Sequence, residues 1–510
     1  MKPARSLCLL LLVPIALTAC GGPSGGPAGS GAVKTDGTFT VSVSSEPGTL
    51  DPQLSLLQVA RQVTTFLYDP LVHQAADGKI VSGLAKSWQE TPGKVVFTLQ
   101  DGVTCSDGSP LTAQDVAVNI NFVVDPKSAS PLSGNFPPAG VQASADNATK
   151  QVTLTTAKPT GFLLQNVAGV PIVCAKGMAD RATLGRGASG TGPYTLKEVV
   201  AGDHYTLERR AGYTWGPGGA NNTVPGQPRT VVVKVVGDET TAANLLLSKA
   251  LNAAVVAGPD QARVKGAGLT QHSFNAMFGE FLYNQAGGRP GADKNVRQAL
   301  TQALDLAQIR KVLTVGAGSA PTALESQTPC RDGDVSSALP GHDPAAARAA
   351  LAGLGGKPLT LIYQSKLGPA ATSAMELAVQ QWKAAGANVE ARGVTDVDLT
   401  NITRKTGAWD IVLLPLDGQN PLQMQSSFSG PMTGGNVASI RNADYDRQAA
   451  EATQQVGTAG CPTWAKAEQA LVAGSDVVPF AITDYPTWGT GASFTTTFSV
   501  IDATSIRVQE

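Results

Sequence analysis

The residues best suited to covalent chemistry in this 510-residue chain are its six cysteines, and Cys20 has the most informative context. Lys2 and Arg5 precede an apolar stretch, Leu7–Leu17, that is too short to span a bilayer comfortably and is typical of a signal peptide. Cys20 ends the run Leu-Thr-Ala-Cys, which fits the lipobox of lipoprotein signals. A diacylglyceryl thioether at Cys20 would supply two acyl chains, enough for stable anchoring. We predict a signal peptide over 1–19 and a lipid anchor at Cys20 on the extracytoplasmic face of the cell membrane. The alternatives are an ordinary secretory signal or a short hydrophobic helix.

Four cysteines remain once Cys8 leaves with the signal and Cys20 takes the lipid: Cys105, Cys174, Cys330 and Cys461. An even number of cysteines in an oxidising compartment indicates up to two disulfides, and four cysteines allow three pairings. The alternative is that they are buried free thiols. A zinc site is disfavoured, because there is no Cys-x-x-Cys motif and the four histidines are isolated along the chain.

The usual signatures of an enzyme are missing. The chain has no His-Glu-x-x-His motif and no phosphate-binding P-loop, and no Gly-x-Ser-x-Gly elbow joins a predicted strand to a helix. The net charge is −1 and the basic residues do not cluster, which argues against nucleic-acid binding. We therefore predict a protein without enzymatic activity, cofactor, metal site or nucleic-acid partner.

The folded part of the chain begins after a tether. Residues 21–31, GGPSGGPAGSG, cannot form a core, so we expect a flexible, lipidated segment over 20–36. The roughly 470 residues that follow are too many for one compact core and predict two or three domains. No later segment is long and apolar enough to span a membrane.

Residues 95–116, VVFTLQDGVTCSDGSPLTAQDV, predict a strand, a tight turn and the start of a helix. Val95–Leu99 is apolar and rich in β-branched residues, and two Asp-Gly pairs follow it. Thr112 is a good helix N-cap, with Asp115 three residues further on. The whole string resembles the signature of the extracytoplasmic solute-binding proteins of family 5, the peptide, dipeptide and nickel binders of ABC importers.

Other segments resemble motifs of the same family, in the family's order, over nearly all of the mature chain. They include Leu50-Asp51-Pro52, Tyr68-Asp69-Pro70-Leu71, Gly190-Thr191-Gly192-Pro193-Tyr194 and Val296–Leu300. The chain departs from the family at Arg210, where Asn is usual. The resemblance implies an α/β, two-lobed periplasmic-binding-protein-like fold of type II, with an extra subdomain in lobe one and a ligand cleft between the lobes.

The resemblance also implies the domain boundaries. We expect lobe I over 37–280, with its extra subdomain at about 55–185, lobe II over 281–484, and a return to lobe I over 485–510. With these boundaries we favour the disulfides Cys105–Cys174 and Cys330–Cys461, because each pair then stays within one lobe.

The second lobe alternates predicted strands and helices, which favours a parallel sheet built from right-handed crossovers. One amphipathic helix is predicted over 293–309. Residues 449–472 read as helical around a break at Gly460-Cys461-Pro462.

The expected ligand contacts follow from the family's peptide-binding members, in which a carboxylate of lobe two holds the peptide ammonium group. Asp417 falls on that position, although Leu414 replaces the family's Trp, and Asp417 could equally be part of a solvated turn. Backbone groups near Leu414 and Leu416, and near Leu56 and Gln58, are expected to pair with an extended peptide. Asn436 resembles a loop residue that often lies near the cleft, or belongs to a plain glycine loop.

The resemblance implies a membrane-anchored receptor, expected to be a monomer, that captures short peptides and delivers them to the permease subunits of an ABC importer. The alternatives are the same fold with another cargo, such as a nickel chelate, haem, an oligosaccharide or a signalling peptide. A non-transport adhesin and an enzyme are further alternatives, which the sequence favours less.

Overall fold

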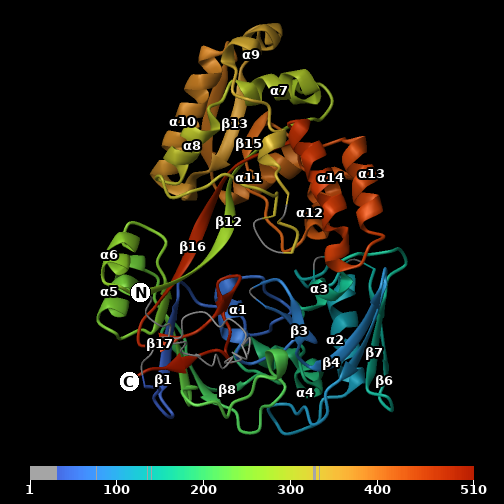
Figure 1. Cartoon of the computed structure of the whole chain (residues 1–510), viewed down its shortest axis with the longest axis vertical. Coiled ribbons are helices and arrows are strands. Elements are labelled where there is room, and N and C mark those ends of the chain that lie inside the picture. The colour runs from blue at the N-terminus through green and yellow to red at the C-terminus, as the bar shows by residue number, and fades with distance from the viewer. Residues whose placement is uncertain (1–31, 76, 135, 139, 326–328, 332) are drawn as a thin grey trace, which may run out of the picture.

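A computed structural model describes residues 32–510, except positions 76, 135, 139, 326–328 and 332. The chain forms two lobes, one above the other along the long axis, joined by a ribbon of two long strands (Figure 1). The two-lobed α/β fold implied by the resemblance is confirmed. The predicted signal peptide, Cys20 and the tether segment 21–31 lie outside the described residues.

The ribbon consists of β12 (Thr270–Tyr283) and β16 (Val477–Gly489). They pair antiparallel along nearly their whole length, and a register shift around Gly279 interrupts the ladder. Such a bulge bends and twists a strand pair locally. The expected boundaries 280/281 and 484/485 fall inside these two strands, so both crossings between the lobes lie in the ribbon. The lobes therefore share one ten-stranded sheet, in the order β14-β13-β15-β12-β16-β11-β1-β10-β9-β8.

Lobe I forms around β1, whose residues alternate between buried and partly exposed, as expected for a strand with one face on a core. β1 pairs parallel with β10 and β11, and β9 and β8 extend the sheet antiparallel. The last residues of the chain complete this core, where the ring of Phe494 packs 5.8 Å from that of Phe39. The strands of lobe I are β1 (Thr38–Val43), β8 (Tyr194–Val200), β9 (His204–Arg209), β10 (Thr230–Val235), β11 (Ala253–Val255), β17 (Ala492–Ser493), β18 (Thr496–Thr497), β19 (Val500–Ile501) and β20 (Arg507–Val508). Its helices are α1 (Gln58–Thr64), α4 (Ala175–Ala179), α5 (Glu239–Leu247) and α6 (Gln261–Gly266).

The extra subdomain has a four-stranded antiparallel sheet in the order β4-β5-β7-β6, packed against α2. Its elements are β4 (Ala85–Thr91), β5 (Lys94–Leu99), β6 (Gln142–Asp146), β7 (Gln151–Thr155), α2 (Ala113–Val124) and α3 (Leu163–Val167), with the small hairpin β2 (Val72–Gln74) and β3 (Ile80–Ser82) beside them. The helix start predicted at Thr112 is confirmed: Thr112 Oγ1 accepts from the Asp115 backbone N–H, and Asp115 caps the Thr112 N–H in return. Most of the buried core of the subdomain lies between Leu71 and Ile172, and Tyr213 and Trp215 complete it, whereas Phe66 and Leu184 pack into lobe I.

Lobe II places helices on both faces of a short sheet. Phe281, Leu361 and Ile411 face one core with α7–α10, whereas Leu282, Ile362 and Val412 face a second core with α12–α14. This alternation follows from the two-residue period of a strand. The elements are β13 (Leu359–Gln364), β14 (Val389–Val394), β15 (Ile411–Leu413), α7 (Lys294–Gln302), α8 (Leu306–Leu313), α9 (Pro344–Leu351), α10 (Gly368–Ala384), α11 (Asp396–Asn401), α12 (Pro421–Phe428), α13 (Ala443–Ala452) and α14 (Cys461–Ala473).

Two expectations for lobe II were wrong in part. The sheet is mixed: β13 is parallel to β14 and β15, but β12 is antiparallel to β15 and β16, because the chain enters and leaves the lobe through one ribbon. The helix expected over 293–309 is two helices, since the Asp305 side chain accepts a hydrogen bond from the Gln308 N–H and starts α8 anew. The break expected near Gly460 is present, because α13 ends at Ala452 and α14 begins at Cys461.

Both disulfides have the favoured pairing. Cys105–Cys174 joins the loop before α2 to the start of α4, with a Cα–Cα distance of 6.1 Å. Cys330–Cys461 joins a lobe II loop to the first residue of α14, with a Cα–Cα distance of 5.0 Å. Each bond therefore fixes an irregular segment to a helix of the same lobe.

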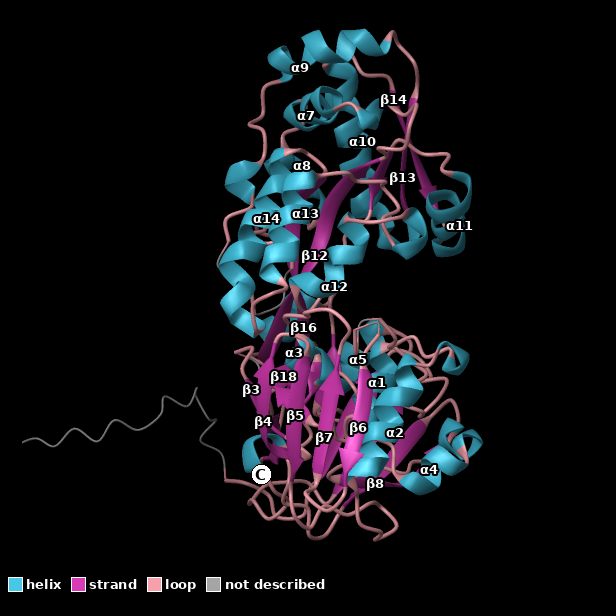
Figure 2. Cartoon of the chain, turned by 90° about the vertical axis from the view of Figure 1, so that its right-hand side faces the viewer, coloured by secondary structure: helices cyan, strands magenta, loops and turns pink. Residues whose placement is uncertain are grey.

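The lobes also touch away from the ribbon, where α3 approaches α12 and α14 (Figure 2). Phe162, at the start of α3, is buried in the second core of lobe II. Asn166 Oδ1 accepts hydrogen bonds from Asn420 (2.7 Å) and Gln423 (3.1 Å) of lobe II. The extra subdomain is thus the part of lobe I that is held against lobe II.

Candidate functional site

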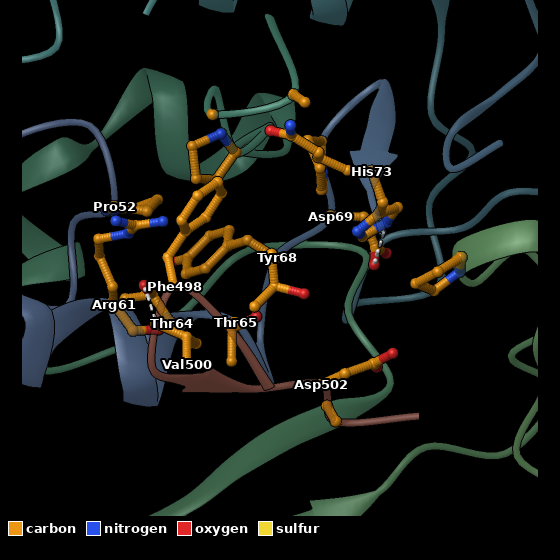
Figure 3. Close-up of a pocket in the computed structure, with 18 of the residues that line it drawn as sticks. Pro52, Arg61, Thr64, Thr65, Tyr68, Asp69, His73, Phe498, Val500 and Asp502 are labelled. Atoms are coloured by element: carbon orange, nitrogen blue, oxygen red, sulfur yellow. Dashed lines mark hydrogen bonds and ion pairs between the residues drawn. The ribbon is translucent and has the colours of Figure 1, made fainter. Parts of the chain in front are cut away.

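A cavity of about 480 Å³ lies where lobe I, its extra subdomain and a loop of lobe II meet (Figure 3). Its walls come from the segment before and within α1, from the C-terminal segment 495–504 and from loops of the subdomain. Among the described residues, Gln419 lines it from lobe II. A cavity of this size is in the range of sites that enclose small molecules.

The loop before α1 is held in place by buried polar side chains. The fully buried Gln53 donates a hydrogen bond from Nε2 to Asn119 Oδ1 at 2.7 Å. Asp51, also buried, forms an ion pair of 2.5 Å with Arg181. Buried polar groups are stable only when paired in this way, and these contacts fix the loop that carries Leu56 at the cavity wall.

The Gly-Thr-Gly-Pro-Tyr motif has a structural role beside the cavity. A Cβ at Gly190 would lie 2.3 Å from the backbone oxygen of Leu67, so only glycine permits this close approach. The Thr191 hydroxyl donates to Asp69 (2.9 Å), and the Tyr213 hydroxyl donates to its other oxygen (2.8 Å). Burial raises the pKa of Asp69. Asp69 lines the cavity, but its hydrogen bonds are used to join three segments of lobe I.

A two-residue turn between β18 and β19 brings Phe498 into the cavity wall. Phe498 and Ser499 have φ values of 52° and 60°, a left-handed conformation that favours glycine and is strained for other residues. The Gln58 amide donates to the Ser499 carbonyl oxygen at 3.4 Å and so ties the turn to α1. Figure 3 shows Phe498 and Tyr68 between Arg61 at one end and His73 at the other.

The lobe II side of the site is the loop between β15 and α12. Asp417 is exposed, and its Oδ2 accepts a hydrogen bond of 3.2 Å from the Met277 N–H of the ribbon. Leu414 and Leu416 are half-buried against the second core of lobe II. The loop therefore reaches from the ribbon to the cavity, where Gln419 lines the wall.

Some of the predicted contact residues lie at the cavity and others do not. Leu56 lines the cavity and is 44 % exposed, while Gln58 holds the turn behind the wall. Asp417, Leu414 and Leu416 lie on the loop that leads to Gln419 but do not line the cavity. Asn436 is 1 % exposed, and its amide bonds the backbone of Gly430 and Ile440. These bonds fix its own loop, and Asn436 does not line the cavity.

Sequence reasoning missed most of the residues that line the cavity, among them Arg61, Tyr68, His73, Phe498 and Asp502. The motif around Tyr68 was found, but its side chain was not assigned to the site. The position of Arg61 was the one signal in the sequence that could have indicated a cavity residue. This charged residue follows shortly after the Leu-Asp-Pro loop, at the expected cleft wall.

Glu280 of β12 is a fully buried carboxylate beside this loop. Burial raises its pKa well above the usual range, the charge of Asp417 raises it further, and a hydrogen bond from the Leu416 backbone opposes both effects. Since the folded state holds this proton more tightly than the unfolded state, stability is greatest below the ordinary pKa of 4.5 and falls as the pH rises above it.

We expect Glu280→Gln to have little effect on the free energy of unfolding at pH 4 and to stabilise the protein by about 0.5–2 kcal/mol at pH 8. Thermal unfolding across this pH range tests the prediction, with the exposed Glu451→Gln as the control variant. A difference in melting temperature that does not change with pH would contradict it.

The part of the chain that the structure describes has no cluster of three or more His, Cys, Asp or Glu side chains suited to a metal ion. Within the same residues, no helix has the length and apolar character needed to cross a membrane.

Two lobes joined by a two-stranded ribbon, with a cavity at their junction, define a ligand-binding protein of the periplasmic-binding class. The family model described as "Bacterial extracellular solute-binding proteins, family 5 Middle" matches residues 79–438. The chain therefore belongs to the extracellular solute-binding proteins of family 5, and the resemblance found in the sequence is confirmed.

Relatives with known names agree with this assignment. The periplasmic oligopeptide-binding protein OppA of Haemophilus influenzae is 23 % identical over 491 residues, 85 % of this chain and 86 % of OppA. The periplasmic murein peptide-binding protein MppA of Escherichia coli is 36 % identical over 100 residues, about a fifth of each chain.

Among solved structures, a substrate-binding protein from Microbacterium hydrocarbonoxydans, complexed with 4-hydroxybenzoate hydrazide, superposes with a TM-score of 0.69. It is 26 % identical, over 92 % of this chain and all of that one. The substrate-binding protein CtaP from Listeria monocytogenes superposes with a TM-score of 0.76 at 20 % identity, over 94 % of this chain and all of that one.

Proposed function

We propose that this protein is a lipid-anchored, monomeric receptor on the extracytoplasmic face of the membrane, which captures short peptides and delivers them to an ABC importer. The observation that carries the proposal is the cavity at the junction of the lobes, next to a lobe II loop that presents Asp417. Membership of a solute-binding family and the peptide-binding names of several relatives support the same function. The anchor is assigned to Cys20 from the sequence alone.

Within this proposal, Asp417 binds the ammonium group of the peptide. Its carboxylate is exposed at the ribbon, so a ligand can reach it, and the pairing becomes buried only when a ligand covers the loop. The half-buried Leu414 and Leu416 flank it and offer backbone groups to an extended peptide. Leu56 lines the cavity from lobe I. No catalytic step is part of this function.

A non-peptide cargo is the second candidate. The structural relative from Microbacterium hydrocarbonoxydans is complexed with 4-hydroxybenzoate hydrazide, which is a small aromatic molecule rather than a peptide. The aromatic lining formed by Tyr68, Phe136 and Phe498 is compatible with such a ligand.

Native mass spectrometry of the mature chain, purified without denaturation, separates these candidates. Co-purified masses that fragment as short peptides would support peptide capture. A single non-peptide mass would overturn it and favour the second candidate.

We expect Asp417→Asn to weaken the binding of tri-alanine by about 2–5 kcal/mol, because the peptide ammonium is left without its counter-charge. This corresponds to a dissociation constant that is about 30-fold to several-thousand-fold higher. Asparagine keeps an acceptor for the Met277 N–H, so the apo protein is expected to fold normally. Isothermal titration calorimetry checks the prediction.

Glu376→Gln, an exposed charge change on α10, serves as the control variant. N-acetyl tri-alanine, which has no ammonium group, should bind the wild type and Asp417→Asn equally weakly. Unchanged affinity of Asp417→Asn for tri-alanine would remove Asp417 from the site.

A further inference from the structure

Arg61 brings a positive charge to the cavity that no acidic side chain neutralises. It is half-buried on α1 and lines the wall (Figure 3). No salt bridge or side-chain hydrogen bond involves its guanidinium among the residues that the structure describes. Asp51, in the loop before α1, is engaged by Arg181 at 2.5 Å. Burial lowers the pKa of the Arg61 guanidinium, and no neighbouring carboxylate offsets that effect.

An arginine in this position is unfavourable for the unliganded protein. A guanidinium remains charged at any pH that proteins tolerate, so it cannot escape the cost of desolvation by losing its proton. Other arginines of this chain with restricted solvent access have partners. Arg181 and Arg297 pair with Asp51 and Asp476. The guanidinium groups of Arg210, Arg310 and Arg507 donate hydrogen bonds to backbone carbonyl oxygens. The departure at Arg61 therefore indicates that its partner is supplied by the ligand.

The rest of the cavity defines what kind of anion fits. Arg61 is the only lysine or arginine among the described lining residues, so the cavity offers one positive charge, which matches one negative charge of a ligand but not a doubly charged phosphate. The lining also includes two carboxylates, and both have hydrogen-bond donors of their own: Asp69 accepts from Thr191 and Tyr213, and Asp502 accepts from Thr504. At the opposite end, burial lowers the pKa of His73, so the imidazole adds no positive charge near pH 7. Tyr68 and Phe498 supply apolar surface between the ends (Figure 3), and Phe136 also lines the cavity. A planar carboxylate on a compact, partly apolar body matches the fork of a guanidinium.

We propose that Arg61 is the carboxylate-binding residue of this receptor and that its ligands are small molecules with one free carboxylate. This inference rests on the proposed function, in which the carboxylate is the C-terminus of a short peptide whose ammonium binds Asp417. Arg61 is on lobe I and Asp417 on lobe II, so a peptide with both ends free contacts both lobes at once. A ligand that lacks either charge loses one of the two charge interactions, which gives the site selectivity for free peptides.

The test compares two matched ligand pairs by isothermal titration calorimetry: tri-alanine with its C-terminal amide, and 3-phenylpropionate with 3-phenylpropionamide. We expect the wild type to bind the acid at least about 10-fold more tightly than the amide in one pair. Arg61→Gln should weaken binding of that acid by about 10- to 100-fold and abolish the preference, and Arg61→Lys should retain part of it. Arg186→Gln, at an exposed position of lobe I, is the control variant.

The two pairs distinguish the sources of the carboxylate. A preference confined to tri-alanine supports both the inference and peptide capture, whereas one confined to 3-phenylpropionate supports the role of Arg61 and contradicts peptide capture. The melting temperature of ligand-free Arg61→Gln should equal or exceed that of the wild type, because an unpaired charge is removed. The inference is overturned if neither acid binds better than its amide, or if Arg61→Gln keeps the preference.

Discussion

Removal of the Cys330–Cys461 disulfide by the double substitution Cys330→Ser/Cys461→Ser is expected to destabilise lobe II by about 5 kcal/mol. The two cysteines are 131 residues apart, and the entropy lost by the unfolded chain on cross-linking increases with the length of the closed loop. The bond also fixes the segment that precedes α9 to the start of α14, next to the buried Trp464. Urea unfolding monitored by tryptophan fluorescence measures the loss.

The Cys105–Cys174 bond provides the comparison, because it spans 69 residues and predicts a smaller loss of about 4 kcal/mol from lobe I. The two lobes have separate cores, so each double variant should shift one unfolding transition more than the other. Equal shifts of both transitions by either variant would contradict this account.

Breaking the ion pair between Arg297 and Asp476 is expected to cost about 3–5 kcal/mol. The pair has an N–O distance of 2.7 Å, and its side chains are 7 % and 2 % exposed. Asp476 also accepts hydrogen bonds from Gln285 and Asn442, so it links the end of the ribbon to α7 and α13. Arg297→Met leaves the buried Asp476 carboxylate without its counter-charge, and thermal or urea unfolding reports the loss.

A double-mutant cycle separates the loss of the pair from the cost of the stranded charge. Arg297→Met/Asp476→Asn should be clearly more stable than the sum of the single variants predicts, since it leaves no charge buried alone. Lys366→Met removes the exposed pair with Asp396 and should cost less than about 1 kcal/mol. Strictly additive single effects in the buried pair would contradict the prediction.

Local signals predicted local structure well in this chain. β5 and the Thr112–Asp115 capping box depend on interactions within one strand or one helical turn. The residues that determine these two features are therefore close together in the sequence. The disulfide pairing followed from assigning each cysteine to a lobe. The split between α7 and α8 was missed, because the apolar spacing continues across the turn and only Asp305 marks the new helix.

The cavity was harder to predict, because it joins segments far apart in the sequence. Gln58 and Ser499 are 441 positions apart, and the hydrogen bond between them holds the turn behind one wall. The local sequence around α1 does not show that the side chain of Arg61 lines the same cavity as Phe498, which is more than 400 residues away in the chain. The position of Asp417 beside the ribbon similarly depends on Met277, whose pairing is a product of the complete fold.

Lobe I is assembled from both ends of the chain, and this affects the order in which the protein can fold during synthesis. β11 pairs with the last residues of β16, and Phe494, Ile501 and Val508 complete the core around Phe39. The nascent chain therefore holds an incomplete N-terminal lobe, with apolar residues uncovered, until its last residues emerge. The lobe II segment lies between the two parts and is complete earlier. Lobe I is thus the first lobe whose synthesis begins and the last lobe to be completed. In a chain shortened by about 25 residues at its C-terminal end, lobe I rather than lobe II would expose apolar residues and be prone to aggregation.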